Sequence, residues 1–207
     1  NLWLAEGKTR LLSVNELKIP GMHNVANALA ALALCRSVGL PYETLMNALR
    51  EFKGLPHRMQ KVAMIRGVNY YDDSKSTNVG SAIAALNGMR GRIVLIAGGD
   101  GKGQDFSPLI QPIKQYVRAL VLLGRDAERI GNVMREAAKP IHYVSTMQEA
   151  VQLSFLLAEP GDVVLLSPAC ASLDMFRNYI HRAEVFTAAV KEIEHKSIQF
   201  VEKDTYL

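Results

Sequence analysis

The chain lacks the features that mark several classes of protein. Its 207 residues include only two cysteines, and no cysteine or histidine pair has the spacing of a zinc site. The longest apolar stretch, 25–35, has about 11 residues and contains Asn27, whereas a helix that crosses a bilayer needs about 20. We therefore expect a soluble cytoplasmic protein whose thiols, Cys35 and Cys170, stay reduced, with no membrane partner.

The charged residues are not concentrated either. The net charge is +4, but lysines and arginines are scattered among acids, and no segment combines basic residues with aromatics. We therefore expect no nucleic-acid partner. With 49% hydrophobic and 21% charged residues, the composition is that of a globular protein able to bury a full core.

A polar run at 72–78 is the most informative segment of the chain. It contains two carboxylates, a lysine and several hydroxyl or amide groups, and it has no apolar side chain. Strand composition at 67–71 precedes it and helical spacing at 79–86 follows it, which predicts a strand-to-helix turn. Open parallel sheets hold their ligands at such turns.

Two further strand patterns also end in polar turns. The apolar run 92–97 leads into 98–103, which has four glycines and Lys102, and the run 162–166 leads into 167–172. Glycines let a backbone approach a ligand closely, and Lys102 adds a positive charge. In a parallel sheet the three turns would converge at one edge, so we expect one site there.

Alternation of strand and helix patterns predicts an α/β fold with a Rossmann-like, mostly parallel sheet covered by helices on both faces. The first two strands could form a hairpin. The predicted strands are 60–66, 68–72, 92–97, 118–123, 140–144 and 162–166. The predicted helices are 78–87, 107–116, 126–137, 146–158 and 174–195.

The amino-terminal part predicts a hairpin that turns at Gly7, followed by two helices. The first would be capped by His23 or Asn24 and reach about Val38, and the second would cover 42–52. Glycine and proline at 54–58 indicate a linker. The predicted domains are therefore 1–56 and 57–195, with a polar tail at 196–207.

The polar and glycine turns are also compatible with ordinary structural roles and with a different chemistry. Asp72 and Asp73 could cap the following helix, and single lysines are usually solvated. A nicotinamide-dependent oxidoreductase could use the glycine turn, with Asp126 as ribose partner, although the dinucleotide spacing is wrong. A non-catalytic binding domain is a third class.

Five motifs together resemble the Mur ligase family, and within it the members that add D-glutamate to UDP-N-acetylmuramoyl-L-alanine. The Asp-Ser-Lys-x-Thr-Asn form at 73–78 is more similar to these members than to their siblings. The five motifs lie at 21–31, 54–58, 73–78, 98–102 and 166–174.

The resemblance implies a fragment of a longer, cytoplasmic and monomeric ligase of peptidoglycan synthesis. Residues 1–56 would end a central ATP-binding domain, without its phosphate loop, and 57–195 would form the carboxy-terminal domain that binds D-glutamate. ATP and Mg²⁺ would serve the full-length enzyme, with the metal ligands outside this chain. The isolated chain would then be inactive.

The resemblance also implies residue roles. It places Asn24 and Asn27 at the adenine of ATP, Arg58 and Asp73 near its ribose and phosphates, and Lys75 at phosphate transfer, which makes Arg58, Asp73 and Lys75 the catalytic candidates. Both carboxylates of D-glutamate would be held by Thr77, Lys102, Ser172 and the segment from Leu173 to Tyr179. Three residues depart from the family pattern: Gln60 for Glu, Tyr179 for Phe and Ala183 for Gly.

Overall fold

A computed structural model describes residues 2–19, 21–89 and 91–204, with side chains through residue 197. The backbone divides into two compact units, Asn1–Leu55 and Pro56–Leu207. Within the described ranges, no helix combines the length and apolar character needed to cross a bilayer.

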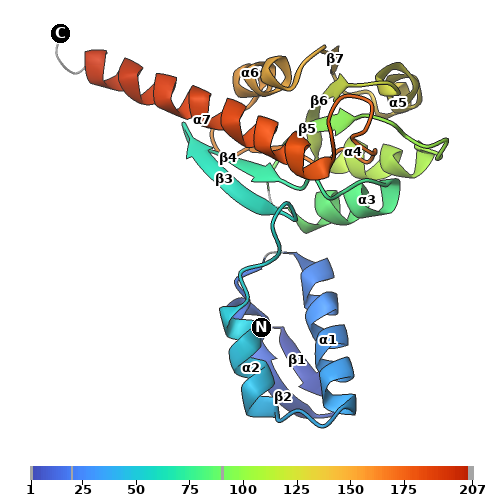
Figure 1. Cartoon of the computed structure of the whole chain (residues 1–207), viewed down its shortest axis with the longest axis vertical. Coiled ribbons are helices and arrows are strands. Elements are labelled where there is room, and N and C mark those ends of the chain that lie inside the picture. The colour runs from blue at the N-terminus through green and yellow to red at the C-terminus, as the bar shows by residue number, and fades with distance from the viewer. Residues whose placement is uncertain (1, 20, 90, 205–207) are drawn as a thin grey trace. The chain divides into compact units, whose positions relative to one another are not determined.

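The first unit contains a hairpin and two helices (Figure 1). Strands β1 (Trp3–Glu6) and β2 (Thr9–Ser13) pair antiparallel, and Gly7 takes a φ of 58° in the turn, as the sequence predicted. A short 3₁₀ turn, η1 (Val14–Glu16), leads toward helices α1 (Met22–Ser37) and α2 (Tyr42–Glu51). The core of this unit consists of Leu4, Leu12, Val25, Ala28, Leu32, Leu45 and Met46.

The predicted cap of α1 is wrong. The helix begins at Met22, and Gly21, rather than His23 or Asn24, precedes it. The Gly21 carbonyl accepts hydrogen bonds from the backbone N–H groups of Asn24 and Val25. Gly21 has a φ of 98°, a backbone conformation that residues other than glycine rarely adopt, which explains why the helix starts directly after Gly21.

The second unit is a six-stranded sheet in the order β3-β4-β8-β5-β6-β7. All neighbours pair parallel except β3, which pairs antiparallel with β4 as the predicted hairpin. The predicted α/β fold with a mostly parallel sheet is therefore confirmed. The strands are β3 (Gln60–Ile65), β4 (Val68–Asp72), β5 (Ile93–Gly98), β6 (Val117–Leu123), β7 (Ile141–Tyr143) and β8 (Val163–Leu166).

Helices cover both faces of this sheet (Figure 1). Ile93, Leu95 and Ala97 of β5 belong to one core cluster, and Val94 and Ile96 of the same strand belong to the other. Such two-sided burial explains the uninterrupted apolar strand sequences. The first cluster includes residues of α3 (Val79–Gly88), α4 (Ile110–Tyr116) and α5 (Ala127–Met134), and the second includes residues of α6 (Met147–Leu157) and α7 (Tyr179–Asp204).

The topology reverses direction at the carboxyl end of β8. The chain leaves β4 and β5 for helices on one face, whereas it leaves β8, which lies between them, for α7 on the other. Neighbouring strands whose connections go to opposite faces leave a crevice at their carboxyl ends, where ligands bind in open α/β sheets. The three polar turns all lie at this edge.

Both predicted ends of the last helix, 174 and 195, are wrong. Helix α7 starts at Tyr179 rather than at 174, because the segment before it folds into a turn in which the Ser172 carbonyl accepts from the N–H groups of Met175 and Phe176. The helix also continues through the part of the expected polar tail, 196–204, that the structure describes. The last three residues of that tail, 205–207, lie outside the described residues.

Candidate functional site

The turn after β4 is fastened to the turn after β8. The Asp73 N–H donates to the Leu166 carbonyl at 2.9 Å, and the Ser167 hydroxyl donates to Asp73 Oδ2 at 2.9 Å. Asp73 Oδ1 accepts from the Met59 N–H at 3.2 Å. The Asp73 side chain is therefore fixed by donors from two segments, and only 6% of the residue is exposed.

This environment changes the acidity of Asp73. Burial raises its pKa to about 7, because a buried carboxylate loses hydration. Hydrogen bonds from Ser167 and Met59 act in the opposite direction, as does the charge of Arg58, while the nearby Asp72 carboxylate raises the pKa further. Asp73 therefore titrates close to neutral pH, which is typical of groups at functional sites.

Backbone and side-chain contacts join the start of the second unit to the same turn. His57 Nδ1 lies 2.8 Å from Asp72 Oδ2, and the Lys75 N–H donates to the His57 carbonyl at 3.1 Å. Gln60 Oε1 accepts from the His57 N–H at 3.1 Å. The Gln60 side chain therefore holds the His57 backbone. The family pattern has Glu at position 60.

The turn after β5 also contacts the turn after β4. Lys102 Nζ donates to the Thr77 carbonyl at 3.2 Å, which brings these two predicted site residues together. Gln104 accepts from the Val79 N–H at 3.0 Å and donates through Nε2 to the Ala169 carbonyl at 2.7 Å. One glutamine side chain thus links all three turns, a role that the sequence did not reveal.

The turns after β5 and β8 pair with each other through their backbones. The Asp100 N–H donates to the Ala171 carbonyl at 3.0 Å, and the Ala171 N–H donates back to the Asp100 carbonyl at 2.8 Å. Ser172 follows this pair directly and is buried, whereas Leu173 is 72% exposed. The predicted residues Thr77, Lys102 and Ser172 therefore lie on turns that are hydrogen-bonded into one rim.

Two glycines of the β5 turn serve a purpose other than the one expected. A Cβ at Gly98 would lie 2.0 Å from the Leu123 carbonyl oxygen, and one at Gly99 would lie 2.2 Å from that of Ala171. Both contacts are impossible, so these glycines allow the chain to approach its own backbone rather than a ligand. The expectation that they make room for a ligand is corrected to this packing role.

Asp126 has a structural partner as well. Its Oδ2 accepts from the Gly101 N–H at 2.6 Å, and its own N–H donates to the Gly99 carbonyl at 3.0 Å. The carboxylate proposed for a nicotinamide ribose is therefore engaged by the glycine turn itself. This contact removes the main sequence feature that favoured an oxidoreductase.

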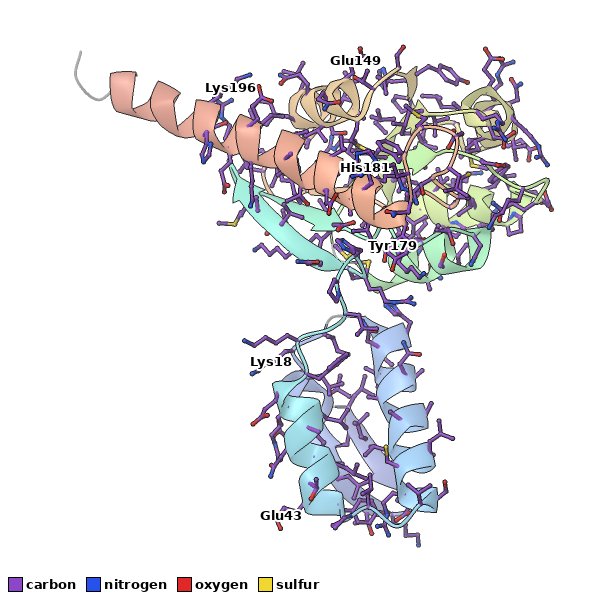
Figure 2. The ribbon with its side chains drawn as sticks, in the orientation of Figure 1. Lys18, Glu43, Glu149, Tyr179, His181 and Lys196 are labelled. Atoms are coloured by element: carbon purple, nitrogen blue, oxygen red, sulfur yellow. The ribbon has the colours of Figure 1, made fainter. Side chains whose placement is uncertain are left out.

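The start of α7 supplies an aromatic ring, that of Tyr179, to the site (Figure 2). Lys75 Nζ lies 4.0 Å from the centroid of the Tyr179 ring, a cation–π contact, and the His57 ring meets the same ring edge-on at 6.1 Å. Tyr179, predicted to contact D-glutamate, thus contacts the lysine predicted to act in phosphate transfer. Phe at this position would keep the contact, because the interaction needs only the ring face.

Arg182 is a site component that the sequence reasoning missed. It is 2% exposed and hydrogen-bonds to Ser74 and to the Cys170 carbonyl. The neighbouring departure from the family pattern, Ala183, is fully buried. A buried arginine at the start of a helix leaves no distinctive sequence signal, because most arginines are exposed.

The remaining predicted residues belong to other segments of the chain. Asn24 and Asn27 are on α1 in the first unit, where Asn27 Nδ2 donates to Asn24 Oδ1 at 3.4 Å. Arg58 is exposed in the second unit, and its charge reaches Asp73. Among the described residues, no group of three or more His, Cys, Asp or Glu side chains could hold a metal ion.

The family model described as Mur ligase, glutamate ligase domain, matches residues 57–170. This chain belongs to the Mur ligase family. A relative from Nitrosomonas europaea, named UDP-N-acetylmuramoylalanine--D-glutamate ligase, is 68% identical over 198 residues, which cover 96% of this chain and 42% of the relative. This Mur ligase chain therefore spans less than half the length of that relative.

Solved structures share the fold at lower identity. A pseudomurein peptide ligase type C from Methanothermus fervidus has a TM-score of 0.65 and 16% identity over 91% of this chain and 41% of that one. UDP-N-acetylmuramate-alanine ligase MurC from Thermotoga maritima has a TM-score of 0.63 and 21% identity, covering 85% of this chain and 39% of its own. Both likenesses support the Mur ligase fold.

Proposed function

We propose that this Mur ligase chain is part of an enzyme that joins D-glutamate to UDP-N-acetylmuramoyl-L-alanine in peptidoglycan synthesis, and that its second unit binds D-glutamate. The observation that carries the proposal is the rim formed by the turns after β4, β5 and β8. The 68% identity to a relative with this name supports the choice of amino acid.

The chemistry of the rim suits a dicarboxylate. We assign the two carboxylates of D-glutamate to Lys102, Thr77 and Ser172, with Leu173 and Tyr179 beside them. A lysine is a compact cation, and hydroxyl groups orient a carboxylate without adding negative charge. Lys102 reaches the Thr77 carbonyl already, so its ammonium stands between the two turns that would hold the ligand.

The reaction we propose has two steps. The carboxylate of UDP-N-acetylmuramoyl-L-alanine takes the terminal phosphoryl group of ATP, and ADP leaves; the D-glutamate amine then attacks the acyl carbon and phosphate leaves. Cations and N–H donors must meet the negative charge that develops in each step. We assign Lys75, Arg58 and Asp73 to the phosphate side, and Asn24 and Asn27 to adenine.

ATP and Mg²⁺ would be bound mainly by parts of the enzyme outside this chain. The proposal includes a cytoplasmic, monomeric enzyme. It also predicts that the purified chain releases no phosphate from ATP in the presence of both other substrates; turnover would contradict the assignment of roles.

Binding of D-glutamate by the purified chain tests the site itself. Isothermal titration calorimetry should show that Lys102→Ala weakens D-glutamate binding by about tenfold or more, because a hydrogen bond to a charged group contributes about 1.5–3 kcal/mol. Lys114→Ala is the matched control, since Lys114 is an exposed lysine on α4. Equal affinities for the wild-type chain and both variants would contradict the site.

A further inference from the structure

Arg182 is an unusual buried cation. The residue is 2% exposed, and none of the ion pairs among the described side chains includes it. Burial lowers its pKa to about 10, which still leaves it charged at neutral pH. Burying such a charge is costly, so its partners should explain its presence.

Among the described residues, its hydrogen-bond partners are all oxygens of the two turns beside it, and the charges of Asp72 and Asp174 also act on it. Nε donates to Ser74 Oγ at 3.0 Å, one terminal nitrogen donates to the Ser74 carbonyl at 2.8 Å, and the other donates to the Cys170 carbonyl at 3.1 Å. The planar guanidinium thus joins the turn after β4 to the turn after β8, and its own backbone belongs to α7.

Ser74 extends this link to the aromatic ring of the site. Its hydroxyl donates to the Tyr179 carbonyl at 2.8 Å while it accepts from Arg182. The next residue, Lys75, has its ammonium over the Tyr179 ring at 4.0 Å. The position of the Lys75 ammonium relative to this ring therefore depends on how Ser74 is held against α7.

We propose that Arg182 is a positioning residue that clamps Ser74 between α7 and the turn after β8, and thereby places Lys75 over Tyr179 and Thr77 at the rim. The effect of Arg182 on the positions of Ser74 and Lys75 does not depend on a bound ligand. The consequence for D-glutamate rests on the proposed function, because Thr77 is assigned to that ligand.

Arg182→Lys tests the proposal in the 207-residue chain. Lysine keeps the charge, but a single ammonium cannot reproduce the fork of three hydrogen bonds. The ring current of Tyr179 should displace the NMR signals of the Lys75 Hε protons in the wild type, and this displacement should disappear in the variant. D-Glutamate affinity should fall by about tenfold or more.

Arg118→Lys is the matched control. Arg118 is also a guanidinium that joins two segments, through Asp162 at 2.6 Å and Glu159 at 2.7 Å, but it lies at the amino end of β6. Its replacement should lower stability and leave the Lys75 signals and D-glutamate affinity unchanged. If Arg182→Lys does not fold, Ser74→Ala removes two hydrogen bonds of the clamp, the one from Arg182 Nε and the one to the Tyr179 carbonyl, and should reduce the displacement partly.

The outcomes separate the two proposals. A folded Arg182→Lys chain with unchanged Lys75 signals overturns the positioning role. An equal loss of the Lys75 signal displacement and of D-glutamate affinity in Arg118→Lys overturns it as well. If the wild-type chain does not bind D-glutamate, the proposed ligand is wrong, yet the Lys75 signals still decide whether Arg182 positions the turn.

Discussion

The titration of Asp73 offers a sharp physical test of the site. Replacing Asp73 by Asn removes an ionisable group of nearly the same shape that is 6% exposed. The amide can still accept from the Met59 N–H, and its Nδ2 can turn its hydrogen toward Ser167. The substitution therefore changes the charge at this position more than the packing.

The expected effect follows from the raised pKa. Between the ordinary value of 3.8 and about 7, the folded chain holds a proton on Asp73 that the unfolded chain has released. The free energy of unfolding therefore decreases as the pH rises through this window, by at most about 1.4 kcal/mol per pH unit and about 4 kcal/mol in total. The free energy of unfolding of Asp73→Asn does not include this decrease. The variant should therefore gain stability relative to wild type as the pH rises, and the difference should level off above about pH 7.

Two measurements check this expectation. The carboxyl carbon of Asp73 can be titrated by NMR, and amide hydrogen exchange in β5 and β8 reports the stability of the second unit at each pH. The fluorescence of Trp3, the sole tryptophan, reports the first unit separately and should follow the same pH course in both proteins.

Asp105→Asn provides a control of opposite sign. Asp105 is exposed, and hydrogen bonds from Ser107 lower its pKa, so its contribution to stability is present at neutral pH and is lost as the pH falls. The reasoning fails if Asp73 titrates near pH 4, or if the stability difference between Asp73→Asn and wild type does not change with pH.

Two further predictions concern packing at and near the site. Gly99→Ala should destabilise the second unit by about 3 kcal/mol or more, because the new Cβ meets the Ala171 carbonyl oxygen. Gly103→Ala should cost only about 1–2 kcal/mol, because its φ is positive but no atom lies within 4 Å of the new Cβ. Equal urea midpoints for the two variants would contradict this difference. Tyr70→Phe should raise stability by about 1 kcal/mol, because no described residue hydrogen-bonds to the buried hydroxyl, and a lower thermal midpoint would show that the hydroxyl is satisfied.

The sheet and most helices could be predicted because their signals are local. Short apolar runs such as 93–97 fit strands buried on both faces, and glycine or polar turns separate them from the helices. The start of α7 was missed although a local signal exists: Asn178 accepts from the His181 N–H, as a residue preceding a helix does. Residues 174–178 mix apolar and polar side chains, so the helix was predicted to start at 174.

The candidate site could be predicted only in part. The three polar turns are visible as breaks after apolar runs, and parallel topology implies that they share an edge. The roles of Gly99, Gln104 and Arg182 depend on partners up to 108 residues away in sequence, which no local pattern encodes. Long-range contacts with main-chain oxygens therefore remained hidden until the fold was known.

The most direct test of the central claim is to map D-glutamate binding on the backbone amide NMR spectrum of the chain. The account predicts that D-glutamate shifts the signals of Thr77, Lys102 and Ser172 together, with one dissociation constant, and that L-glutamate shifts them much less. Shifts confined to one turn, or equal responses to both enantiomers, would contradict a single D-glutamate site at this edge of the sheet.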